Sequence, residues 1–206
     1  MKPDLIAEQQ PKVVLQQLGL SVGDVKFIII THFHADHISG LKQFPNARFI
    51  TDDGAFNHVQ KASTLANSKH GIFAELFPND FADRMISIST LNRSELGHHK
   101  LEGADLLGDG SMVSVELPGH STGHFGVLIN SGGKSLFYAV DTQWHLQAVT
   151  ENRIPGLPTN LIAEDHDAWV RSTQWVGEIL KDGYEVVLCH HPEDGPFDFN
   201  IETGTT

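Results

Sequence analysis

The sequence has 206 residues, of which 40% are hydrophobic and 19% charged, ordinary usage for a globular chain with a sizeable core. Its 26 acidic and 14 basic residues give a formal net charge of −12, which disfavours a nucleic-acid surface. The single cysteine, Cys189, excludes an internal disulfide framework and fits a reducing compartment such as the cytoplasm.

No segment of the sequence predicts a membrane or export role. No apolar run reaches the roughly 18 residues of a membrane helix. Residues 1–10 lack the apolar core of a secretory signal. We therefore expect a cytoplasmic protein, unless truncation has removed an N-terminal signal.

The first half of the chain is predicted to contain two strands with helices around them. From the N-terminus we expect a helix over 3–18, strands over 25–31 and 47–51, and a helix that begins at Asp52 or Asp53 and runs through Leu65. Residues 67–84 carry large apolar side chains at roughly helical spacing. They predict either a helix packed on the core or an apolar flap over a pocket.

The second half of the chain reads as strand-rich, with one long helix near its end. We expect a β-rich segment over 85–117, strands over 112–117, 125–130, 135–140 and 184–189, an irregular segment over 142–163, a helix over 163–181 and a loose tail over 192–206. A hairpin turn is expected over 131–134. The alternation of strands and helices predicts a mixed α/β fold of stacked layers.

The segment 31–37 (Thr-His-Phe-His-Ala-Asp-His) places three imidazoles and a carboxylate directly after a β-branched strand. Side chains two residues apart in an extended segment point the same way, so His32 and His34 should form one pair. Asp36 and His37 can aim elsewhere once the chain turns. Placement after a buried strand favours a site for two metal ions over a loop of solvated histidines.

Three later strand ends repeat this placement. His120 follows the strand 112–117, Asp141 follows 135–140, and His190 follows 184–189. His191 competes with His190, which we prefer because it comes first after the strand. Five imidazoles and two carboxylates suit borderline divalent ions, zinc first, with iron, manganese or cobalt as alternatives.

These residues together resemble the metallo-β-lactamase superfamily of hydrolases, over about residues 10–192. The resemblance implies an αβ/βα sandwich, in which two sheets pack together with helices outside. Within the superfamily, residues 117–124 resemble the lactonase and organophosphate-hydrolase branch, because a second histidine, His124, follows four residues after His120. We expect His124 to be structural rather than a ligand.

The resemblance also implies roles for the site residues. The first metal would be held by His32, His34 and His120, the second by Asp36, His37 and His190, and Asp141 would bridge both. A hydroxide shared by the two ions would attack a lactone or ester, or a phosphotriester, and Asp36 would pass a proton to the leaving oxygen. The expected partner is a small-molecule substrate, without nucleic acid or membrane; a homodimer is compatible with this assignment.

Two features depart from the family pattern. Quorum-quenching lactonases usually carry a tyrosine three residues beyond the bridging aspartate, where this chain has Trp144. The family also has strands before the helix at 10–18. We therefore expect one domain over 1–206, either a fragment that lacks its first strands or a domain with one reduced sheet.

Other activities of the same fold remain open. A thioester hydrolase resembling glyoxalase II is disfavoured by the acidic tail at 193–198, and a nuclease by the net charge of −12. Arylsulfatase-like and phosphodiesterase-like enzymes are further alternatives. Outside enzymes, the chain could be a catalytically weak metal-binding fragment.

Overall fold

The computed structural model describes residues 10–96, 101–131, 134–153, 156 and 163–191. Its first sheet is parallel, with the strand order β1-β2-β3. The strands are β1 (Phe27–Ile29), β2 (Arg48–Thr51) and β3 (Met85–Ser87). Parallel neighbours need crossover connections, and here these are helical. They comprise α2 (Ala35–Ile38), η2 (Leu41–Gln43), α3 (Asp53–Lys61), α4 (Thr64–Lys69), η3 (Ala74–Leu76) and α5 (Phe81–Arg84), while α1 (Pro11–Gln17) precedes β1.

The second sheet has the order β6-β7-β8-β9. Its strands are β6 (Met112–Glu116), β7 (Phe125–Ser131), β8 (Lys134–Val140) and β9 (Glu185–Leu188). The first three pair antiparallel, and β9 joins β8 in parallel after a crossover through α6 (Leu146–Thr150) and α7 (His166–Lys181). Between the two sheets in sequence lie η4 (Ile88–Thr90) and the hairpin of β4 (Arg93–Leu96) and β5 (Leu101–Ala104).

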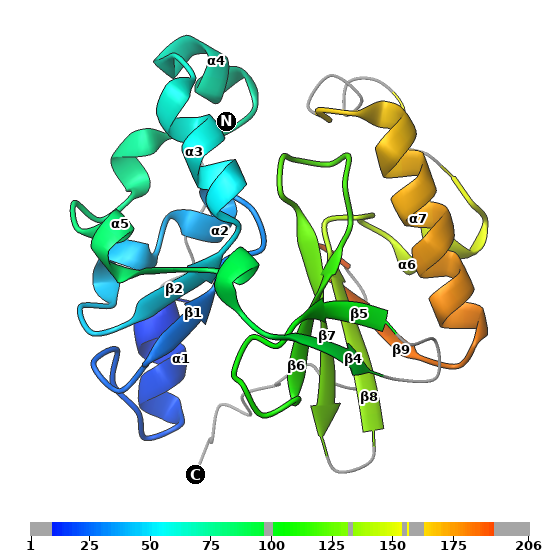
Figure 1. The fold of residues 1–206 in the computed structure, drawn as a ribbon, viewed down its shortest axis with the longest axis horizontal. Coiled ribbons are helices and arrows are strands. Elements are labelled where there is room, and N and C mark those ends of the chain that lie inside the picture. The colour runs from blue at the N-terminus through cyan, green and yellow to red at the C-terminus, as the bar shows by residue number, and fades with distance from the viewer. Residues whose placement is uncertain (1–9, 97–100, 132–133, 154–155, 157–162, 192–206) are drawn as a thin grey trace, which may run out of the picture.

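Three apolar clusters show how these layers pack. Ile50 of β2 and Val127 of β7 belong to one buried cluster, which therefore joins the two sheets. Phe49 packs on the opposite side of the first sheet with Phe56 of α3. The outer side of the second sheet packs against Val176 of α7. Helices thus lie outside two facing sheets, as Figure 1 shows, which confirms the predicted αβ/βα sandwich.

Two segments differ from the sequence-based expectation. The segment 142–163, expected to be irregular, contains α6. Residues 67–84 do not form one helix but several short pieces, because Gly71 adopts φ +69° and ends α4. Phe77 and Phe81 nevertheless contact Phe33 in the core, with ring centroids 5.3 and 6.1 Å away. This part of the segment therefore belongs to the core and is not a flap.

Some expectations lie outside the described residues. They concern residues 3–9, the tip of the hairpin at 132–133, the tail 192–206, and the adjacent His98 and His99, whose polar surroundings gave only a weak indication of a role at a site. Among the described helices, none has the length and apolar character needed to cross a membrane.

Candidate metal centre

The loop after β1 alternates core anchors with ligand-type side chains. Phe33 is buried at 1% exposure among Phe56, Phe77 and Phe81, and this anchor leaves its neighbours His32 and His34 on the other side. His34 is the N-cap residue of α2. The single turn of α2 then carries Asp36 and His37.

The loop after β6 is shaped by a close approach to α7. Gly119 has φ +118°, and a Cβ there would lie 2.0 Å from the backbone nitrogen of Trp169. Only glycine allows this contact. The Ser172 hydroxyl also donates to the Pro118 carbonyl at 2.7 Å. These contacts hold His120 at the end of α7, with its ring 5.8 Å from that of Trp169.

Asp141 stands on a constrained stretch of backbone at the end of β8. The preceding Val140 has φ +49°, which is unusual for a β-branched residue, and the β8–β9 register is irregular between Tyr138 and Val140. The Trp169 indole donates to the Thr142 carbonyl at 2.7 Å. The segment is therefore fixed on both sides of Asp141, as a buried carboxylate with a defined direction requires.

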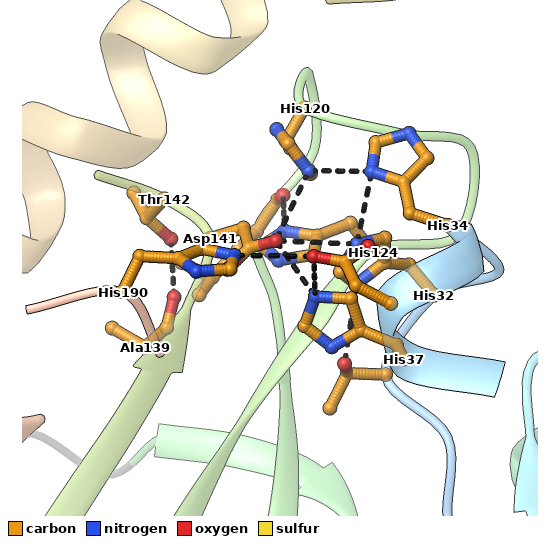
Figure 2. A network of polar contacts seen from close by, with 12 residues as sticks. His32, His34, His37, His120, His124, Ala139, Asp141, Thr142 and His190 are labelled. Atoms are coloured by element: carbon orange, nitrogen blue, oxygen red, sulfur yellow. Dashed lines mark hydrogen bonds and ion pairs between the residues drawn. The ribbon is translucent and has the colours of Figure 1, made fainter. Parts of the chain in front are cut away.

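Four side chains form the first candidate metal group: His32, His34, His120 and Asp141. One ligand atom from each lies within 4.8 Å of all the others. Nδ1 of His34 is 3.1 Å from Nε2 of His32 and 3.0 Å from Nε2 of His120. Oδ2 of Asp141 lies 3.4 Å from the His32 nitrogen and 3.5 Å from the His120 nitrogen. Figure 2 shows these nitrogens turned toward one another above the carboxylate.

The second candidate group shares Asp141 and adds His37, Cys189 and His190. Nε2 of His37 lies 3.0 Å from Asp141 Oδ2, and Nε2 of His190 lies 3.5 Å from Asp141 Oδ1. Asp36 borders this group, with Oδ2 3.4 Å from the His190 nitrogen and 3.6 Å from the His37 nitrogen. Its side chain is 57% exposed, so Asp36 forms the solvent side of the centre.

The structure thus brings together the seven residues predicted as ligands, from four strand ends. His190 faces the centre, whereas His191 lies toward α6, where its Nδ1 accepts from the Leu146 backbone nitrogen at 3.4 Å. Trp144 lies beside His190, with ring centroids 6.4 Å apart, and is 45% exposed. Cys189 was not predicted as part of the centre, although it directly precedes His190 in the sequence.

His124 lies behind the first group and donates from Nδ1 to the Leu117 carbonyl at 2.7 Å. Its Nε2 is buried without a hydrogen-bond partner. The ring is 5.1 Å from that of His32, so His124 supports the centre from behind.

Burial keeps the inner imidazoles neutral. It lowers the pKa of His34 to about 4, with a smaller effect from nearby His120, and it lowers the pKa of His32 well below its ordinary value. Burial would raise the pKa of Asp141, but hydrogen bonds from His120, His32 and His37 lower it by more. Neutral imidazole nitrogens around an ionised carboxylate are the form in which these residues bind metals.

The polar atoms of the centre also fit a cation. Asp141 is 3% exposed, and its Oδ1 is buried with no hydrogen-bond partner. Nδ1 of His34 lies at hydrogen-bond distance from Nε2 of both His32 and His120, and one neutral ring nitrogen has a single proton or a single lone pair, so it cannot pair fully with both. A metal ion accepts electron pairs from all of these atoms at once. The donor set therefore fits divalent ions such as zinc.

Comparison with known proteins places the chain among metallo-hydrolases. The profile described as "Metallo-beta-lactamase superfamily" matches residues 2–191. The N-acyl homoserine lactonase AttM of Rhizobium radiobacter is 25% identical over 169 residues, which cover 76% of this chain and 60% of that protein. AttM of Azorhizobium caulinodans is 26% identical over 184 residues, covering 88% and 64%. The chain thus spans about three fifths of the length of these curated relatives.

Solved structures support the fold. AidC, described as a dizinc quorum-quenching lactonase in complex with a product, superposes with a TM-score of 0.68 at 19% identity, over 94% of this chain and 66% of that one. A variant of B. thuringiensis AiiA with N-decanoyl-L-homoserine at its active site gives a TM-score of 0.64 at 17% identity, over 92% and 65%.

Proposed function

Because the chain belongs to the metallo-beta-lactamase superfamily, we propose that it is a hydrolase of lactonase type that uses two divalent ions to open a lactone or a related ester. The observation that carries this proposal is the shared position of Asp141. Its Oδ2 lies 3.0 Å from the nitrogen of His37 and 3.4 Å from that of His32, and its Oδ1 faces His190. A carboxylate shared by two groups of imidazoles is what a bridging ligand requires.

The residues divide into two sets under this proposal. One ion would be held by His32, His34 and His120, the second by Asp36, His37 and His190, and Asp141 would contact both. When bound, the ions would polarise the substrate carbonyl and lower the pKa of water. Zinc is the expected metal, and iron, manganese and cobalt are the alternatives.

Opening of the lactone ring then requires that the leaving oxygen receive one proton. Water adds to the carbonyl carbon, the ring C–O bond breaks, and the departing oxygen takes up a proton. Asp36 is the residue that we assign to this transfer, because its carboxylate is on the solvent side and contacts both His37 and His190. Trp144 can donate a hydrogen bond but cannot supply a proton, so its expected role is contact with the substrate.

The names of the relatives suggest which lactone to test first. N-acyl homoserine lactonases are among the proteins that this chain resembles, and we propose N-acyl homoserine lactones as its first candidate substrates. The free thiol of Cys189 is compatible with the cytoplasm, which keeps thiols reduced.

A hydrolysis panel on zinc-loaded and manganese-loaded protein tests the proposal. It includes N-acyl homoserine lactones, a simple lactone, aryl esters, a thioester and a phosphotriester, with the metal content measured in every sample. We expect lactone hydrolysis that chelation abolishes. Turnover of the thioester alone would favour a glyoxalase II-like enzyme. Two bound ions without any turnover would favour a metal-binding protein and contradict the proposed activity.

Variants connect activity to the centre. His34→Ala and Asp141→Ala should abolish hydrolysis and reduce bound metal, because each removes a central ligand. Asp83→Asn changes an exposed carboxylate on α5 and serves as the matched control. Full activity in metal-depleted His34→Ala protein would contradict the mechanism.

A further inference from the structure

The second half of the metal centre contains a sulfur atom. Cys189 offers its Sγ within 4.8 Å of ligand atoms from His37, Asp141 and His190, and all four atoms lie within that distance of one another. Asp36 lies at the edge of the same group, with Oδ2 3.4 Å from the His190 nitrogen and 3.6 Å from the His37 nitrogen. The thiol therefore adds a sulfur donor to a half-site that already contains imidazole and carboxylate donors.

An independent observation is that a buried polar atom of this half-site has no hydrogen-bond partner. Asp141 is 3% exposed, and its Oδ1 has no hydrogen-bond partner. Oδ1 is the oxygen that faces His190, at 3.5 Å from Nε2, so it points into the group that contains Cys189. A buried carboxylate oxygen without a donor is costly. A cation placed among these four atoms would satisfy it.

The backbone explains how two consecutive residues reach the same ion. β9 ends at Leu188, and residues 189 and 190 lie in a turn, so the strand rule that places neighbours on opposite faces no longer applies. The Cys189 backbone nitrogen donates to the Val140 carbonyl at 2.9 Å. Cys189 is thereby held beside the strained residue that immediately precedes Asp141.

A neighbouring side chain supports the sulfur. Tyr138 of β8 interacts with the side chain of Cys189. Outer contacts of this kind orient and tune metal ligands. The sulfur is also accessible, since Cys189 is an exposed free cysteine.

We propose that Cys189 is a further, thiolate ligand of the second metal ion, which adds sulfur to the half-site formed by Asp36, His37, His190 and Asp141. This inference rests on the proposed two-metal function. On binding, the S–H bond is replaced by a sulfur–metal bond and the proton leaves to solvent, without oxidation or reduction. A thiolate favours zinc or cobalt over manganese, because soft ligands prefer these ions. Cys189 would thus determine which metal the second half-site selects.

Cobalt titration of the metal-free protein tests this inference. With the second equivalent of Co²⁺ we expect a near-ultraviolet sulfur-to-cobalt charge-transfer band, which the first equivalent does not give. Cys189 is the only cysteine in the chain, so no other thiol can produce the band. Cys189→Ser keeps the size of the side chain and should lose the band. Its second-site zinc affinity should fall by at least the about 10–100-fold typical for loss of an outer-shell partner.

Two measurements on proteins that retain sulfur complete the test. In the wild type, two bound ions should protect Cys189 from a thiol reagent that modifies the metal-free protein. Tyr138→Phe should keep the charge-transfer band but shift it. Two bound cobalt ions without a band, or a single bound ion at saturation, would overturn the inference. A band with no hydrolysis of any substrate would support Cys189 as a ligand while contradicting the proposed function.

Discussion

Acidification should unfold the metal-free protein because two buried imidazoles must be protonated. Mainly through burial, the pKa is lowered from 6.5 to about 4 for His34 and to about 3 for His124. As the pH falls, these histidines therefore take up protons in the unfolded chain before they do so in the folded one. The free energy of unfolding is unaffected by them above pH 6.5, and it decreases as the pH drops from 6.5 toward the pKa values of the folded state. Each group should remove about 1.4 kcal/mol per pH unit. From pH 6.5 to 4.5, the two together should remove about 5 kcal/mol.

Other groups of the centre do not cancel this loss. Burial is the largest influence and lowers the pKa of His37, but the hydrogen bond to Asp141 and the charges of Asp141 and Asp36 together raise it by more, so its net pKa is raised. His37 therefore contributes its full stabilisation to the free energy of unfolding below pH 6.5, and this contribution stays constant as the pH falls further. The pKa of Asp141 lies below its ordinary value of 3.8, outside the tested window. His32, whose pKa is also lowered by burial, adds to the loss.

Urea unfolding of chelator-treated protein at pH 6.5, 5.5 and 4.5 measures the effect. His124→Asn is the test variant, because its amide can replace the Nδ1–H donor to the Leu117 carbonyl but does not titrate. Its dependence on pH should be shallower than that of the wild type by about 1.4 kcal/mol per unit. His58→Asn, on the exposed side of α3, should keep the wild-type slope. Equal slopes for wild type and His124→Asn would refute the reasoning.

Three further predictions concern the scaffold, and urea unfolding measures each. Gly119→Ala should lower the free energy of unfolding by about 1–3 kcal/mol or more, because its Cβ would collide with the Trp169 backbone. A urea midpoint equal to that of the wild type would contradict this contact. Trp169→Phe removes the indole donor to the Thr142 carbonyl and should lose about 1–3 kcal/mol, together with weaker zinc binding in a competition titration; unchanged zinc affinity would show that Trp169 does not position Asp141. Phe81→Ala should lose about 3–5 kcal/mol, whereas Phe73→Ala, at a position 38% exposed, should stay within about 0.5 kcal/mol. Similar losses for both would argue against core packing of Phe81.

The strand ends could be predicted because they follow local rules. Apolar β-branched runs form buried strands, and His32, Asp141 and His190 each stand just beyond one. The alternation of side chains also predicted that His32 and His34 would act together, and their ring nitrogens lie 3.1 Å apart. The secondary structure of residues 67–84 could not be predicted in this way, because a series of short apolar turns and a single apolar helix have similar amino-acid compositions.

What the sequence determined by itself is the set of ligand-type residues and their order along the chain, since strand pattern and turn chemistry act between near neighbours. Only the tertiary structure decided the distances at which they meet, and it alone placed Cys189 beside them. The choice of His190 over His191 and the approach of Cys189 depend on the turn after β9 and on the backbone of Val140, to which the turn is hydrogen bonded. Packing of α7 against the second sheet fixes Asp141 through Trp169. Such contacts join residues far apart in the chain, and no local pattern encodes their distances.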